Sequence, residues 1–436
     1  DRALHTFLVI PCDVVEFSGA FLISTFVSCW RARCVQRSQR LDSSAASEVY
    51  RRQNSVRRLA AASAVALAIG GAAHADEVNI GFTGPLSGGA ALYGENTLEG
   101  LRMAAEEINA AGGITVDGEE YTINIQALDD KYSPSQAAVN GKRLVQQYNA
   151  PVIFTPHSGG TFALQAFNER DGFLVMSYTS VPAVTSKGNK LTVKIPPNFT
   201  DYIEPFSRIT MDRFGNKLGV ANATHDYAKY GTKEFVPVWR ELGGEVAAMN
   251  PMDYNKSADF YTGVSKVLSE DPDVMFVGGA SEPTGLVVRQ ARELGFKGGF
   301  ILMDQAKMDE VAKVSGGIKS LEGSVGVVPL DKYENEGAKL FLEKWQQEHN
   351  GVATSETAYN YFAMYLIAQA MQEAGTVDDA KAIRAAIASA MDKVSVEHNP
   401  YDVDGIDEAG NLGADPQIAE VVDGEVVLRK LSEITE

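Results

Sequence analysis

The sequence predicts an α/β fold with two doubly wound lobes, and three observations lead to this fold class. Strand-like apolar runs alternate with amphipathic helical stretches from Val78 to Ser180. The proline-rich stretch KIPPNFTD interrupts the alternation, which then resumes at Lys217 over a similar length. Three helical stretches and two short apolar runs follow the second unit. Alternating strands and helices form parallel sheets with helices on both faces, so each unit is predicted to be one lobe.

The first unit begins with VNIGFT, which is predicted as a buried strand. A helix is expected from Glu95 to Ala110, ending at two glycines, and TINIQALDD is expected as the second strand. The next helix, SPSQAAVNGKRLVQQY, has Pro134 near its first turn, where proline is favoured. PVIFTP, TFALQAFNERDG and FLVMSYTS are then expected as strand, helix and strand.

The second unit follows an irregular joint from Lys194 to Asp201. Four strands are expected, in the runs KLGVANAT, EVAAMN, DVMFVGGA and GGFILMD. Helices are expected in YGTKEFVPVWRELG, SADFYTGVSKVLSE and SEPTGLVVRQARELG. We expect residues 76–195 and 329–414 to form lobe 1, and residues 196–328 and 415–436 to form lobe 2. Three hinge crossings near Pro196, Val328 and Asp415 would join them.

The N-terminal region has the layout of a secretory signal peptide at residues 56–75. Two arginines precede an apolar stretch and a small-residue site in RRLAAASAVALAIGGAAHA, so cleavage after Ala75 and export to the periplasm are expected. The alternative, a buried alanine-rich helix, has few bulky side chains to pack. Residues 1–55 would then be upstream sequence or an artefact. Their apolar run contains Asp13 and Glu16, which are costly in a membrane.

The charge of the predicted mature chain is strongly negative. Nine arginines and five acidic residues lie in residues 1–75, which leaves 30 basic and 52 acidic side chains. A surface with a net charge of −22 repels nucleic acid and anionic lipid. We therefore expect no nucleic-acid partner and relate the acidity to solubility.

The glycine-rich stretch GPLSGGAALYGE stands between the first strand and the first helix, where phosphate-binding loops occur. It lacks the lysine of GxxxxGK[ST] and the spacing of GxGxxG, and Glu95 would repel a phosphate. The sequence therefore predicts no nucleotide cofactor. Tyr93, an aromatic residue among small ones, favours a binding loop over a purely structural turn.

A second glycine loop, TPHSGGT, follows a strand and carries Ser158. GxSxG is absent, so binding of an anion through Ser158 and backbone N–H groups is more natural than nucleophilic catalysis, with a helix N-cap as the alternative. Thr179 and Ser180 end the next strand at the same sheet edge. Ligands of doubly wound sheets bind at that edge. The matching positions of the second unit are Tyr230, Ala280, Ser281 and Asp304.

Metal and acid–base sites receive no support from the sequence. The four histidines after residue 75 are scattered, HExxH is absent, and DVDGIDEAGN departs from the calcium-loop order. No carboxylate pair stands out from the acidic surface. We therefore predict no metal, no cofactor and no enzymatic activity.

Several of these stretches together resemble a known family. The stretches are IGFTGPLSGGAALYGENTLEGLRMAAEEINAAGGI, LDDKYSPSQAAVNGKRLV, SGGT, VVRQARELGF and IDEAGN. In their order and spacing they are similar to the type I periplasmic solute-binding proteins of branched-chain amino acid ABC importers. The resemblance covers nearly all of residues 76–436. It implies a monomer with two lobes that close on a small ligand about three hinge strands and then dock on a membrane permease.

The resemblance also implies roles for particular residues. Tyr93 matches the loop aromatic, Ser158 and Thr179 or Ser180 match the carboxylate-binding hydroxyls, and Tyr230 matches a lobe 2 tyrosine. Asp304 falls where an acid holds the ligand's ammonium group, although a solvated aspartate at a strand end is the alternative. This chain departs from the family pattern in three ways. Asp304 is shorter than the usual glutamate, and an aromatic residue near Ala280 is missing. The family's cysteine pair is absent, and its positions fall on about Tyr132 and His157.

The leading hypothesis is a periplasmic amino acid binder of an importer. Relatives of this fold also take aromatic acids, amides or urea, so these ligands form the alternative. The sensing half of a receptor would need a membrane span and a signalling segment after the lobes, and neither follows here. A secreted hydrolase would need a nucleophile, base and orienting group, which the scattered histidines do not provide.

Overall fold

Two sheets organise the chain in the computed structural model, which describes residues 75–349, 351–413 and 417–429. The predicted leader, signal peptide and third hinge position lie outside these residues. We refer to the parts built on the first and second sheets as lobe 1 and lobe 2. The described residues form one compact unit. The predicted α/β class with two doubly wound lobes is confirmed.

Lobe 1 contains a six-stranded sheet in the order β2-β3-β1-β4-β5-β6. Its strands are β1 (Asp76–Gly84), β2 (Ile114–Val116), β3 (Glu119–Asp129), β4 (Val152–Thr155), β5 (Leu174–Ser177) and β6 (Thr192–Lys194). All neighbours are parallel except β2, which is antiparallel to β3. A separate hairpin pairs β12 (Gly405–Ile406) with β13 (Leu412–Gly413).

Lobe 2 contains a seven-stranded sheet in the order β15-β14-β11-β10-β9-β7-β8. Its strands are β7 (Lys217–Val220), β8 (Glu245–Met249), β9 (Val274–Val277), β10 (Gly299–Leu302), β11 (Val325–Val327), β14 (Ile418–Val422) and β15 (Glu425–Arg429). Strands β14 and β15 pair antiparallel at one edge. The order β3-β1-β4-β5-β6 in lobe 1 therefore repeats as β8-β7-β9-β10-β11 in lobe 2.

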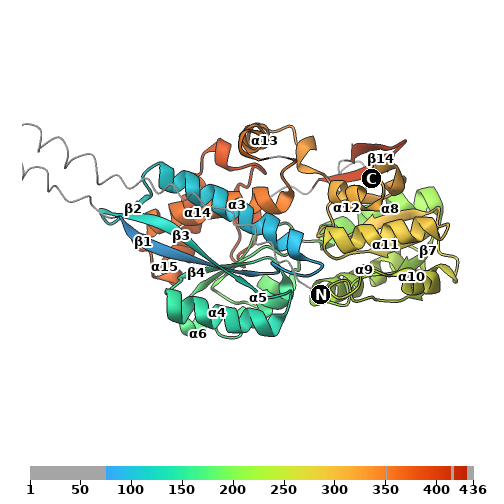
Figure 1. Cartoon of the computed structure of the whole chain (residues 1–436), viewed down its shortest axis with the longest axis horizontal. Helices are drawn as coiled ribbons and strands as arrows, with labels where there is room; N and C mark the ends of the chain where they lie inside the picture. Colours follow the sequence, from blue (N-terminus) through green and yellow to red (C-terminus); the bar gives the residue numbers. More distant parts are fainter. Residues whose placement is uncertain (1–74, 350, 414–416, 430–436) are drawn as a thin grey trace, which may run out of the picture. The chain divides into compact units, whose positions relative to one another are not determined.

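Helices cover both faces of each sheet (Figure 1). In the lobe 1 segments they are α3 (Ala91–Ala110), α4 (Pro134–Tyr148), α5 (Ser158–Gln165), α6 (Asn168–Asp171), α7 (Ala183–Ser186), η2 (Leu330–Lys332), α13 (Glu336–Glu348), α14 (Ser355–Ala374), α15 (Ala380–Met391) and η3 (Val396–His398). In the lobe 2 segments they are α8 (Thr200–Phe214), α9 (Asp226–Glu241), α10 (Tyr261–Leu268), α11 (Ser281–Glu293), α12 (Met308–Ser315) and η1 (Ile318–Leu321).

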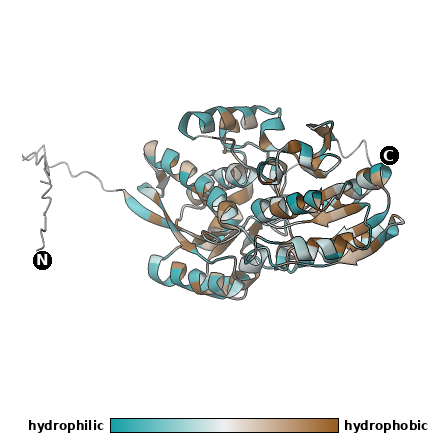
Figure 2. Ribbon diagram, turned by 45° about the vertical axis from the view of Figure 1, so that its right-hand side comes forward, coloured by the Kyte–Doolittle hydropathy of each residue, from teal (hydrophilic) through white to brown (hydrophobic). Residues whose placement is uncertain are grey.

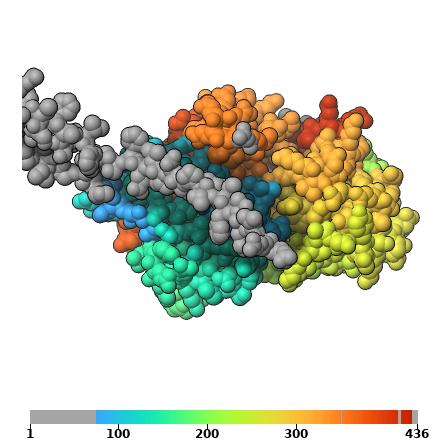
Figure 3. Space-filling view, in the orientation of Figure 1, coloured from blue at the N-terminus to red at the C-terminus, as the bar shows by residue number. Residues whose placement is uncertain are grey.

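The core follows from the apolar strands, which are brown in Figure 2. In lobe 1 one apolar layer joins β1, β4 and β5 to α3, α14 and α15, and a second lies under α4 and α5. In lobe 2 one layer joins the sheet to α8 and α9, and another joins it to α10, α11 and α12. Figure 3 shows the orange residues of the late helices beside the blue and teal residues of lobe 1. The first and last thirds of the chain thus build one lobe.

The chain changes sheets three times. It leaves lobe 1 after β6, returns after β11, and enters lobe 2 again at β14. The exact lobe boundaries at 195/196, 328/329 and 414/415 stay predictions.

Helix α8 was not expected from the sequence, which predicted an irregular joint and then a strand. Its N-terminal end overlaps KIPPNFTD at Thr200 and Asp201, and it contains Pro205. Proline normally weakens a helix interior. The helix forms because Tyr202, Ile203 and Phe206 bury their side chains on the lobe 2 sheet.

Candidate cleft between the lobes

The carboxyl ends of the parallel strands define the candidate site. Ligands of doubly wound sheets bind where the strand order reverses, which here is between β1 and β4 and between β7 and β9. A groove is lined by loops from these ends in both lobes, including Gly89, Tyr132 and His157 of lobe 1 and His225 and Asn255 of lobe 2. The sequence-predicted site residues lie after these strands or their neighbours.

The glycine-rich loop after β1 approaches lobe 2 directly. A β-carbon at Gly89 would lie 2.7 Å from the carbonyl oxygen of Tyr254, so this position requires a residue without a side chain. Helix α3 begins at Ala91 rather than at Glu95, which places Tyr93 in its first turn instead of in a loop. The buried Tyr93 hydroxyl donates to the carbonyl oxygens of Pro156, at 2.8 Å, and Tyr178, at 3.3 Å. Tyr93 therefore ties the ends of β4 and β5 together.

Three predicted hydroxyls of lobe 1 are buried without a hydrogen-bond partner. Ser158, Thr179 and Ser180 are each less than 5% exposed, and none of their side-chain oxygens has a partner among the described residues. Ser158 is also the first residue of α5, where the helix dipole favours an anion. Buried hydroxyls are normally hydrogen-bonded, so these three hydroxyls are suited to donate hydrogen bonds to an acceptor atom of a ligand.

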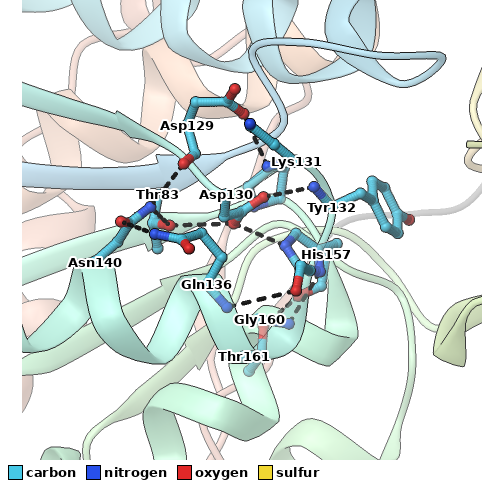
Figure 4. A network of polar contacts seen from close by, with 12 residues as sticks. Thr83, Asp129, Asp130, Lys131, Tyr132, Gln136, Asn140, His157, Gly160 and Thr161 are labelled. Carbon is cyan, nitrogen blue, oxygen red and sulfur yellow. Dashed lines mark hydrogen bonds and ion pairs between the residues drawn. The ribbon is translucent and has the colours of Figure 1, made fainter.

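An acid–histidine network lies at the N-terminal end of α5 (Figure 4). The fully buried Asp130 carboxylate lies 2.9 Å from Nε2 of His157 and accepts from the Thr83 hydroxyl at 3.1 Å. The other ring nitrogen of His157 accepts from the N–H of Gly160 at 2.9 Å, so His157 caps α5. The sequence analysis kept a helix N-cap as the alternative role of the loop around Ser158, and the structure shows that His157, just before the helix, is the N-cap residue. Its ring is turned to Asp130 and serves to position the loop.

Tyr132 connects this network to lobe 2. Its ring stacks on His157 with centroids 4.6 Å apart, at the two positions that the resemblance associates with a cysteine pair. It also lies 4.8 Å from the ring of His225, and its hydroxyl accepts from the Gln305 amide at 2.6 Å. Burial lowers the pKa of His225 to about 3, which keeps that ring neutral near neutral pH.

Asp304 follows β10 and accepts a hydrogen bond from a tyrosine that the sequence analysis did not name. Helix α9 begins at Asp226, one turn earlier than expected, so Tyr227 lies at the strand end and its hydroxyl donates to the Asp304 carboxylate. Tyr230 lies a turn further along and packs on Phe162 of lobe 1, with ring centroids 5.5 Å apart. Tyr230 thus contributes to the contact between lobes, and Tyr227 is the residue that sequence reasoning missed.

Three further tyrosines lie within electrostatic range of Asp304. Tyr178 and Tyr359 come from lobe 1, and Tyr202 comes from α8 of lobe 2. Burial raises the pKa of all three phenols, and the Asp304 carboxylate raises it further. These side chains therefore stay protonated. They come from three separate segments, so no local motif could have indicated them.

Ser281 has a structural partner in lobe 2. Its buried hydroxyl accepts from the backbone N–H of Lys307 at 2.9 Å. Ser281 therefore holds the segment that follows Asp304, and Ala280 beside it is the N-cap residue of α11.

Two other kinds of site find no support in the described residues. Within residues 75–349, 351–413 and 417–429, no group of three or more His, Cys, Asp or Glu side chains could hold a metal ion. No helix in this described part has the length and apolar character needed to cross a membrane.

Two lobes with repeated strand order and a groove at their strand ends, lined by polar side chains of both lobes such as His157 and Asp226, define a two-lobed ligand-binding protein. The predicted Ser158, Thr179, Ser180 and Asp304 do not line this groove. A family model for periplasmic binding proteins matches residues 77–425. The chain belongs to this periplasmic binding protein family.

Two relatives come from Pseudomonas aeruginosa. An amino acid binding protein is 29% identical over 73% of this chain and 85% of the relative. A leucine-, isoleucine-, valine-, threonine- and alanine-binding protein is 25% identical over 81% of this chain and 92% of the relative.

Solved structures show the same fold. A leucine-binding protein from Thermotoga maritima superposes with a TM-score of 0.67 at 22% identity, over 81% of this chain and 98% of that one. A solute-binding protein of an ABC transporter from R. palustris, in complex with benzoate, superposes with a TM-score of 0.69 at 18% identity, over 81% of this chain and 95% of that one.

Proposed function

We propose that this chain is the substrate-binding protein of an ABC importer and that it binds a small amino acid in the cleft between its lobes. The ligand is held by both lobes, which close about the three crossings and deliver it to a membrane permease. Family membership and the amino-acid-binding names of the relatives support this function. We expect no catalytic turnover and a monomeric protein.

One observation carries the proposal. Three buried hydroxyls of lobe 1, on Ser158, Thr179 and Ser180, lack hydrogen-bond partners, and the Asp304 carboxylate of lobe 2 lies near enough to Tyr178 of lobe 1 to raise the pKa of that phenol. Hydroxyls and a helix N-terminus suit a carboxylate, and an acid suits an ammonium group. An α-amino acid carries both groups a short distance apart.

Titration calorimetry on the protein without its leader tests this function. The panel contains L-leucine, L-isoleucine, L-valine, L-threonine and L-alanine, together with 4-methylpentanoate, which is leucine without its ammonium group. We expect at least one amino acid to bind and leucine to bind much more tightly than 4-methylpentanoate. Equal binding of the two would remove the role proposed for Asp304.

A second class of ligand has one specific observation in its favour. The Asp304 carboxylate raises the pKa of four tyrosines, Tyr178, Tyr202, Tyr227 and Tyr359, so these aromatic side chains lie near it, and a similar structure holds benzoate. Benzoate, 4-hydroxybenzoate, amides and urea therefore join the panel. Binding of benzoate without binding of any amino acid would replace the first proposal with an aromatic-acid binder.

Export and closure form the remaining part of the proposal. We expect processing after Ala75, which mass spectrometry of the periplasmic protein checks by finding Asp76 first. We expect small-angle scattering to give a smaller radius of gyration when ligand saturates the cleft. An N-terminus near Asp1 in the periplasm, or an unchanged radius, would contradict these two points respectively.

A further inference from the structure

The segment of lobe 2 from Asp304 to Glu310 makes three contacts with lobe 1. The Gln305 amide donates to the Tyr132 hydroxyl at 2.6 Å, and the Asn96 amide donates to Glu310 at 2.8 Å. Between them, Nζ of Lys307 lies 3.9 Å from the Glu356 carboxylate. The residue proposed to hold the ligand's ammonium group is therefore the first residue of a segment that bridges the lobes.

Lys307 stands in the middle of this segment and contacts both lobes. Its ammonium group donates to the main-chain oxygen of Asp304, and its own N–H donates to Ser281. The same ammonium lies 5.9 Å from the ring centre of Tyr178 in lobe 1. The side chain is 8% exposed, so it is fixed in place rather than solvated.

Glu356 is the counter-charge from lobe 1. This second residue of α14 is fully buried, and neither carboxylate oxygen has a hydrogen-bond partner among the described residues. Burying a charged carboxylate without hydrogen-bond donors has a large desolvation free energy, and a nearby cation offsets part of it. The charged and titratable groups around it are Lys307 and Glu310 of lobe 2 and Tyr93, Tyr178 and Tyr401 of lobe 1.

We propose that Lys307 is a positioning residue of the cleft: it fixes the main chain at Asp304 and is itself held by Glu356 and Tyr178 when the lobes are together. Asp304 is then correctly placed for a ligand only while lobe 1 contacts Lys307. This inference rests on the proposed function, because it concerns how the same cleft holds its ligand.

The decisive variants are Lys307→Met, Glu356→Gln and the double variant, assayed by calorimetry with the amino acid that the wild type binds. Lys307→Met loses the contact at Asp304 and leaves Glu356 buried without a cation, so affinity falls about tenfold or more. Glu356→Gln keeps an acceptor for Lys307 and changes affinity less than about threefold. The double variant binds more tightly than Lys307→Met, because it no longer buries an unpaired charge.

The pH dependence provides a readout that general destabilisation would not produce. Burial raises the pKa of Glu356 to about 7, against the opposing effect of Lys307. A raised pKa means that the folded chain takes up a proton that the unfolded chain does not hold, so this contribution to stability is present at low pH and is lost as pH rises through about 7. We expect this trend in the free energy of unfolding of the wild type, a steeper one in Lys307→Met, and its loss in both variants with Gln at position 356.

Lys344→Met is the matched control. Lys344 pairs with Glu107 at 2.8 Å within lobe 1, so the substitution breaks an ion pair without touching the cleft segment. It should lower the melting temperature and leave ligand affinity within twofold. A loss of affinity in the control equal to that in Lys307→Met would show a general effect and overturn the inference.

Hydrogen exchange without ligand separates this inference from the proposed function. The N–H of Gln305 donates to Tyr227 at 3.1 Å, and we expect it to exchange faster in Lys307→Met. If the wild type binds no amino acid, the proposed function fails and this exchange experiment still judges the positioning role. Unchanged exchange, or unchanged affinity in a wild type that does bind, would overturn it.

Discussion

The strand ends of the two lobes differ in polarity and in how completely their polar groups are partnered. In lobe 1, Ser158, Thr179 and Ser180 present buried hydroxyls without partners. In lobe 2, the Asp304 carboxylate accepts a hydrogen bond from the Tyr227 hydroxyl. The main-chain oxygen of Asp304 accepts a second hydrogen bond from the Lys307 ammonium group. The strand order is the same in both lobes, so the backbone does not create this difference. Residue choice at the strand ends therefore creates the difference on which the proposed placement of a carboxylate and an ammonium group rests.

The largest expected effect comes from removing the negative charge of lobe 2. Asp304→Asn keeps an oxygen that can accept from Tyr227 but cannot neutralise an ammonium group. Amino acid binding should weaken by about 2–5 kcal/mol, the range for truncating a buried charge pair. Calorimetry on both proteins measures the difference. An unchanged affinity would mean that Asp304 is a solvated strand-end residue and that the lobes do not differ as described.

A smaller effect is expected from one hydroxyl of each lobe. Ser158→Ala should weaken binding of a carboxylate ligand by about 1.5–3 kcal/mol, typical of a hydrogen bond to a charged group, while the melting temperature stays the same or rises. Ser281→Ala should instead lower stability by about 1–3 kcal/mol, because the buried N–H of Lys307 loses its acceptor. Thermal melts and calorimetry on the two variants compare the lobes directly. Loss of stability in Ser158→Ala would show a structural hydroxyl in lobe 1.

The smallest effect concerns the two histidines that follow β4 and β7. His157 contacts an acid at 2.9 Å, whereas burial lowers the pKa of His225 to about 3. As pH falls, His225 takes up a proton in the unfolded chain before it does so in the folded chain. The stability contributed by the neutral His225 is therefore present above about pH 6.5 and is lost as pH falls toward 3. Denaturant unfolding at pH 7 and pH 5.5 should show about 1 kcal/mol more loss for the wild type than for His225→Gln. Equal losses would contradict a neutral His225.

The sequence allowed the fold to be predicted because strand and helix periodicity are local properties. The prediction was wrong at α8, which the sequence analysis took for an irregular joint. Prolines precede this helix and Pro205 lies inside it, so local propensity does not indicate a helix, which packing stabilises. The prediction also placed the starts of α3 and α9 about one turn late, which put Tyr93 in a loop and left Tyr227 outside the expected helix. Periodicity locates the middle of a helix better than its first turn.

The candidate site was only partly accessible from the sequence for a different reason. Ser158 and Asp304 follow recognisable strands, so their place at the sheet edges could be predicted. Lys307 and Glu356 meet across the lobes although 49 positions separate them in the chain. No spacing rule connects such residues, and Glu356 reads as an ordinary acid in the first turn of a helix.

The stack of Tyr132 on His157 has a consequence for how the protein can be produced and studied. All three cysteines of the sequence lie before residue 35, so residues 76–436 contain no thiol. Where the resemblance associates a cysteine pair, this chain uses ring stacking and the hydrogen bond to Asp130. That wall of the cleft therefore needs no oxidation, and residues 76–436 should fold alike in a reducing cytosol and in an oxidising compartment. A cysteine introduced on either lobe would be a unique site for a spectroscopic label.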